Sequence, residues 1–176
     1  MALELVGATA PQRNDHPAAR LLPITTTLLA TVISLQPTHI PGYAALTPAF
    51  TLMAVYHWTI YRPDLLPPLS LFLLGITQDL LAGAPPGGTA LILLLAHATV
   101  LRYRRRFVNR PFPYVWAGFT MLTAGAMLLL WTLHCLLDGA LVDFRGTVFR
   151  AVLTTSMFPI ASYLLGRIQR TAMGAG

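Results

Sequence analysis

Asp79 has the clearest potential for chemistry, because it stands inside an apolar stretch, where an ionisable group is retained only when something holds it. It ends the run Gly75-Ile76-Thr77-Gln78-Asp79 and precedes a turn, residues 82–89, that is rich in proline and glycine. Such a turn cannot continue a helix, and its backbone amides need acceptors. A carboxylate one helical turn away is suited to accept from them.

Two interpretations of Asp79 follow from its position. As a structural lock, it would accept hydrogen bonds from amides around Gly87 and Gly88, or from His134 or Arg145. As part of a proton or ion relay, it would need further titratable groups at the same membrane depth. The candidates for such a relay are His134, Arg145 and Arg150. The lock is favoured because Asp79 is expected near the membrane interface.

The remaining residues that could act in chemistry are scattered along the chain. The five histidines are His16, His39, His57, His97 and His134. None forms the i, i+4 pair of a helical metal motif, and a single cysteine, Cys135, excludes a cysteine cluster. Nucleophile-elbow, zinc-protease and phosphate-loop motifs are also missing from the sequence. We therefore expect no enzyme activity, no metal and no cofactor.

The composition is that of a membrane protein, with 55% hydrophobic and 10% charged residues. Hydropathy predicts an all-α integral membrane fold, a bundle of six transmembrane helices. The predicted segments are about 21–36, 45–61, 65–82, 88–101, 115–137 and 147–165. We expect a disordered N-terminal tail at 1–20, a transmembrane domain at 21–170 and a C-terminal tail at 171–176.

Arginine placement predicts the orientation. Five arginines follow the fourth apolar segment: Arg102, Arg104, Arg105, Arg106 and Arg110. With six spans, ten of the 12 basic residues lie on one side and only Arg145 and Arg150 on the other. The positive-inside rule then places the arginine run and both termini in the cytoplasm. Since the rule accounts for the net charge, we expect membrane lipid and no nucleic acid as a partner.

Small residues in the fifth segment form a possible contact face. Ala117, Thr120 and Ala124 share one side of the predicted helix, with Gly118 and Gly125 beside it. Small residues let helix backbones approach closely in lipid. The face is expected to pack on a neighbouring helix of the same bundle or to receive a helix from another protein, and the first is favoured.

Pro159 in the sixth segment predicts a kink, because it frees the carbonyl of Thr155. We expect the hydroxyl groups nearby to help satisfy the backbone there. They belong to Thr154, Thr155 and Ser156.

The second and third segments carry a pattern that resembles the MreD family of bacterial rod shape-determining proteins. It includes Tyr56-His57-Trp58 and Arg62-Pro63-Asp64-Leu65-Leu66-Pro67. The more specific part is the block from Gly75 to Leu91, called here the Gly75–Leu91 block. Its matching positions are Gly75, Asp79, Gly83, Pro85, Gly87, Ala90 and Leu91. Pro86 departs from the family pattern, which has leucine after the proline.

The resemblance implies a non-enzymatic subunit of the cell-elongation machinery in the bacterial inner membrane. Its implied partners are a single-span MreC-like protein and, through it, a RodA-type glycosyltransferase, a penicillin-binding transpeptidase and MreB filaments. The family is similar in fold to the six-helix substrate-binding subunits of energy-coupling-factor vitamin transporters, which supply the alternative function. That alternative conventionally needs Ala-x-x-x-Ala in the first helix, whereas this chain has Ala30-x-x-x-Ser34.

Overall fold

The computed structural model describes residues 17–34, 48–108, 110–138 and 143–173. These residues form helices, and no strand occurs among them. The elements are α1 (Pro17–Ser34), α2 (Phe50–Tyr61), the 3-10 helix η2 (Pro63–Leu65), α3 (Pro68–Leu81), α4 (Gly88–Phe107), α5 (Phe112–Asp138) and α6 (Phe144–Met173). The all-helical prediction is confirmed for this part of the chain.

The helix boundaries differ from the hydropathy segments in a consistent way. α1 begins at Pro17, inside the expected tail 1–20, and α6 continues to Met173, inside the expected tail 171–176. α4 does not end before the arginines but carries Arg102 to Arg106 on its last turns. The reason is physical: hydropathy reports contact with lipid, whereas a helix continues as long as its backbone hydrogen bonds do. The start of the segment expected at 45–61 lies partly outside the described residues.

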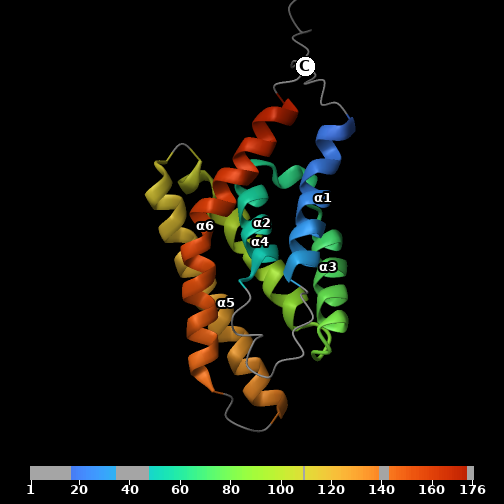
Figure 1. Cartoon of the computed structure of the whole chain (residues 1–176), viewed down its shortest axis with the longest axis vertical. Coiled ribbons are helices and arrows are strands. Elements are labelled where there is room, and N and C mark those ends of the chain that lie inside the picture. The colour runs from blue at the N-terminus through green and yellow to red at the C-terminus, as the bar shows by residue number, and fades with distance from the viewer. Residues whose placement is uncertain (1–16, 35–47, 109, 139–142, 174–176) are drawn as a thin grey trace, which may run out of the picture.

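The short helix α2 forms the centre of the bundle. All its side chains from Thr51 to Ile60 are buried, and the helix packs against α1, α4 and α6. Figure 1 shows α2 and α4 between the α5 and α6 pair on one side and α1 and α3 on the other. A helix buried on every face needs no polar stripe, which agrees with its nearly continuous apolar sequence.

Aromatic side chains fill the core between α2, α5 and α6. The ring of Tyr56 meets Phe119 and Phe158 edge to face, at centroid distances of 5.1 and 5.5 Å. Phe119 and Phe158 stack on each other at 4.1 Å. The Tyr56 hydroxyl donates to the carbonyl of Val115 at 2.8 Å, so its polar end is satisfied inside the apolar core.

Polar side chains of α2 tie it to the helices around it. Trp58 Nε1 donates to Thr26 Oγ1 on α1 at 2.9 Å. Thr59 Oγ1 lies 2.6 Å from the carbonyl of Val55 and 3.0 Å from His97 Nδ1 on α4. The single hydroxyl proton of Thr59 goes to Val55, so Nδ1 of His97 carries the proton and donates to Thr59. In an apolar medium these bonds fix the rotation of α2.

The helices α5 and α6 supply the most exposed apolar surface. The segments Phe112–Leu137 and Phe144–Ile168 are long and apolar enough to cross a membrane. In the most apolar 18-residue stretch of each, only 11% of the residues are buried within the bundle. Pro23–Ser34 and Pro68–Leu81 are shorter apolar helices. Helices that turn their apolar side chains outward, rather than into a core, are suited to lipid.

The carbonyl freed by Pro159 has a partner that the sequence analysis missed. Trp116 Nε1 of α5 donates to the carbonyl of Thr155 at 3.0 Å. The hydroxyl oxygen of Thr154 accepts from the amide of Ala49 at 3.0 Å, and the expectation that neighbouring hydroxyl groups help to satisfy the backbone stays a prediction. The proline therefore creates a hydrogen bond between α5 and α6.

Candidate functional sites

The carboxylate of Asp79 caps the start of α4 from the end of α3. Its Oδ2 accepts from the amide of Gly87 at 2.8 Å, and both oxygens accept from the amide of Thr89, at 3.2 and 3.1 Å. Asp79 is 3% exposed. A buried carboxylate that meets the first amides of a helix satisfies donors without helical partners and also lies at the positive end of the helix dipole.

The amides around Gly87 and Gly88 were expected to donate to Asp79. The amide of Gly87 does so, and the second donor is the amide of Thr89. The other expected donors are engaged elsewhere. His134 Nδ1 bonds to the carbonyl of Leu130 at 2.8 Å, and the side chain of Arg145 is exposed. Among the described residues, the Asp79 carboxylate thus accepts its hydrogen bonds from the backbone of Gly87 and Thr89.

Two glycines shape this turn through their backbone conformation. Gly83 has φ of 66° and Gly87 has φ of 110°, values that other residues rarely adopt. Gly83 ends α3 in the left-handed conformation usual after a helix, and the amide of Ala84 bonds back to the carbonyl of Asp79 at 3.0 Å. Pro85 is exposed between them and limits the freedom of the turn.

Gly75 sets how closely α3 and α4 approach. A Cβ atom built on Gly75 would lie 2.5 Å from the backbone nitrogen of Ala90 and 2.8 Å from its Cβ. Neither helix has room for a larger residue at this crossing. The residues of the Gly75–Leu91 block therefore act together: Gly75 and Ala90 form the crossing, Asp79 closes the turn, and the two glycines let the chain reverse.

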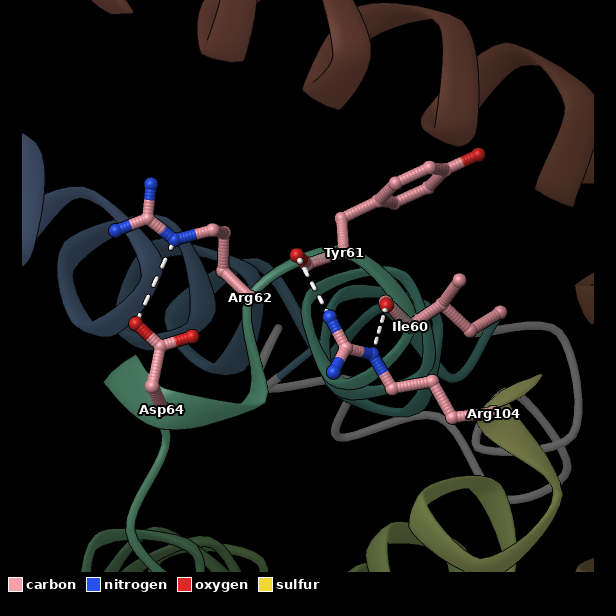
Figure 2. Close-up of polar contacts among 5 residues, drawn as sticks. All are labelled: Ile60, Tyr61, Arg62, Asp64 and Arg104. Carbon is pink, nitrogen blue, oxygen red and sulfur yellow. Dashed lines mark hydrogen bonds and ion pairs between the residues drawn. The ribbon is translucent and has the colours of Figure 1, made fainter. Parts of the chain in front are cut away.

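Arg104 has a structural role that the arginine count did not predict. Its Nε donates to the carbonyl of Ile60 at 2.7 Å, and its second guanidinium nitrogen lies 3.5 Å from the carbonyl of Tyr61 (Figure 2). These are carbonyls at the end of α2, where a positive charge is favourable. Beside them, Arg62 lies 3.6 Å from the carboxylate of Asp64, also in Figure 2.

The other arginines of the run extend toward the solvent. Arg106 lies over the ring of Tyr103 at 5.2 Å, and Arg110 over Tyr114 at 5.8 Å. Arg102 and Arg105 are exposed as well. The run therefore combines one arginine that joins α4 to α2 with several that are free to meet lipid headgroups or a partner.

The small-residue face of α5 is open. Ala117, Thr120 and Ala124 are all exposed, so the expected packing on a neighbouring helix of the bundle is wrong for the described residues. Gly118 does pack inside: a Cβ atom there would lie 2.9 Å from the hydroxyl of Tyr56. Next to the face, α4 and α5 border an apolar groove of about 460 Å³, whose lining includes Met121.

The histidines do not gather into a metal site within the described ranges, where no group of three or more potential ligands occurs. His57 is buried with its ring 4.7 Å from that of Tyr61, and His97 is the partner of Thr59 already described.

These features define an all-helical protein with two helices long and apolar enough to cross a membrane, and its distinctive positions fix a helix crossing and a turn. The chain belongs to the family described as rod shape-determining protein MreD, whose family model matches residues 18–168. The resemblance seen in the Gly75–Leu91 block is thereby confirmed, and the family assigns the chain to the determination of rod cell shape. No curated protein and no solved structure matches the chain. The similarity in fold to vitamin-transporter subunits therefore stays a prediction.

Proposed function

We propose that this chain is a non-enzymatic subunit of the cell-elongation complex in the bacterial inner membrane. It holds a single-span MreC-like protein and, through that partner, a RodA-type glycosyltransferase, a penicillin-binding transpeptidase and MreB filaments. The observation that carries the proposal is the open small-residue face on α5 in a chain of the MreD family. The work is done by helix surfaces, with no chemical step.

The face of α5 suits a transmembrane helix from another protein. Lipid is as apolar as a helix surface, so association in the membrane depends on close packing at small residues and on hydrogen bonds. Ala117, Thr120 and Ala124 lie on successive turns and leave the helix backbone accessible. The hydroxyl of Thr120 donates to the carbonyl of Trp116 at 2.9 Å, so it adds no unsatisfied polar group to the face.

The proposed topology has six crossings and both termini in the cytoplasm. In support, the start of α1, the connection from α4 to α5 and the last turns of α6 lie toward the same end of the bundle (Figure 1). The helix α2 has 12 residues and spans about 18 Å, shorter than the roughly 30 Å hydrocarbon core. Because other helices surround it, a short α2 exposes little of its ends to lipid.

The partner proposal is tested by co-purification with the Ala124→Leu variant. A leucine at this position obstructs close approach of a second helix, so we expect recovery of the MreC-like protein to fall at least several-fold. Ala98→Leu is the matched control, because Ala98 is also exposed but lies on α4. Equal recovery with the parent and both variants would remove the α5 face as the partner site.

The functional class is tested by depletion of the chain in cells. We expect rod-shaped cells to become round and to recover when the parent chain is restored. Normal shape after depletion, together with tight binding of a vitamin by the purified chain, would support the transporter alternative.

The topology is tested by cysteine labelling. Single cysteines at Asn109 and Gly174, in a background without Cys135, should resist a membrane-impermeant thiol reagent added outside intact cells. Labelling of either position before lysis would refute the orientation.

A further inference from the structure

Arg150 is a half-buried cation with no carboxylate partner among the described residues. It lies on α6, six residues after the helix begins, inside the segment Phe144–Ile168 that is apolar enough to cross a membrane. Its Nε atom is inaccessible to solvent and has no hydrogen-bond partner among the described residues. A charged residue at membrane depth is costly and is normally paired, so its surroundings indicate what pairs with it.

A small cavity joins Arg150 to a second unsatisfied polar group. The cavity has a volume of about 60 Å³ and is lined by side chains of α2 to α6. Gln78 of α3 also lines it, is only 9% exposed, and has its Oε1 atom buried without a partner in the described part of the chain. Two polar groups from different helices, both without partners, therefore border one space.

Arg150 carries the one unpaired charge among the described residues that line this space. Thr89, at the start of α4, lines the cavity, so the positive end of that helix lies next to it. Asp79 accepts from the amides of Gly87 and Thr89 but is not among the cavity's lining residues. It therefore offsets the helix end and leaves the guanidinium of Arg150 for another negative group.

We propose that this cavity binds one small anion, of the size of chloride or formate, with the guanidinium of Arg150 as its main ligand. The space can hold a few water molecules, since roughly 10 to 15 Å³ of such a cavity accommodates one, and its volume of about 60 Å³ suits a small anion better than a large one. The side-chain amide of Gln78 can turn by 180° and present its NH₂ group to the anion. The bound ion would join α6 to α3 and to the start of α4. This inference does not depend on the proposed partner complex.

The experiment compares anions with the purified chain in detergent. The protein is first placed in gluconate, which is too large for the cavity, and chloride or formate is then added at constant ionic strength. We expect saturable broadening of the chloride-35 resonance and a melting temperature about 5 to 10 °C higher at an anion concentration near 100 times Kd. Formate should reverse the broadening by competition.

Three variants locate the site. Arg150→Met should abolish the saturable response, whereas Arg145→Met, at an exposed arginine of the same helix, should keep it. Gln78→Glu places a carboxylate beside Arg150, so it should melt in gluconate at about the temperature of the parent in saturating chloride and should no longer respond to chloride.

The proposal is overturned if the parent shows no saturable chloride response, or if Gln78→Glu responds like the parent. These two outcomes are decisive even if Arg150→Met fails to fold, since both are measured on proteins that retain the arginine. A response lost equally in Arg145→Met and Arg150→Met would also overturn it, because the effect would then come from surface charge.

Discussion

The α3–α4 turn and the outward face of α5 are both rich in small residues, but small size serves opposite purposes in the two places. At the α3–α4 turn, Gly75 leaves space that Ala90 of the same chain occupies. On α5, Ala117 and Ala124 leave space that no described residue occupies. A small residue in a membrane helix therefore marks a close approach, and its burial decides whether the neighbour belongs to the same chain.

The two regions also differ in how their polar groups are satisfied. The turn is closed by a carboxylate that accepts from two backbone amides. On α5 the threonine hydroxyl bonds only to its own helix. We therefore expect changes at the turn to alter folding, and changes at the face to alter association.

The largest expected effect is that of Gly75→Leu. The new side chain would run into the backbone of α4 at Ala90, and backbone cannot yield as a flexible side chain does, so we expect a loss of more than about 3 kcal/mol of stability. The measurement is the yield of monodisperse protein in detergent and its melting temperature. Gly166→Ala is the control, since a Cβ atom there meets nothing within 4 Å. A normal yield of Gly75→Leu would mean that α3 and α4 do not cross this closely.

Asp79→Ala should have the next largest effect. It strands the half-buried amides of Gly87 and Thr89, at a cost of about 2 kcal/mol, which corresponds to a melting temperature lower by about 4 to 8 °C. Asp79→Asn should cost about half as much, because its carbonyl still accepts from one amide. If both variants melt like the parent but fail to support rod shape, Asp79 acts on a partner or in a relay instead.

Arg104→Gln should be milder, at about 1 kcal/mol, because Arg104 is only half-buried and water can take the place of its guanidinium at the carbonyl of Ile60. The control is Arg105→Gln, which removes the same charge from the same run at an exposed position. Thermal melting should separate the two variants, since only Arg104 contacts α2. Identical curves would show that the arginines act through their charge alone.

The sequence predicted the turn better than it predicted the contacts between distant helices. Asp79 and the glycines lie within about one helical turn and one loop of each other, so local hydrogen-bond requirements suffice to relate them. Arg104 and Ile60 are 44 positions apart, and their contact depends on how two helices are rotated about their axes. Hydropathy carries no information about this rotation. The sequence therefore predicted only on which side of the membrane Arg104 lies, and not its contact with α2.

Burial was the property least accessible to sequence analysis. The central helix α2 and the peripheral helix α5 are both strongly apolar, yet Val55 is fully buried and Met121 is 81% exposed. In water, an apolar stripe and a polar stripe distinguish the two sides of a helix. In a membrane both core and lipid favour apolar residues, so the pattern that predicts the inward side of a helix is lost.

The smallest expected effect on folding is that of Ala124→Leu. The side chain is exposed on α5, so extra methyl groups meet no part of the described chain, and surface substitutions of this kind usually change stability by less than about 0.5 kcal/mol. The same change at Ala90, which is 1% exposed against Gly75, should be far more harmful. Melting curves of the two variants beside the parent measure this difference directly. If Ala124→Leu melts as early as Ala90→Leu, the face is filled within the folded chain, and loss of the partner would reflect unfolding. If it melts with the parent, a loss of co-purification reports on the interface itself.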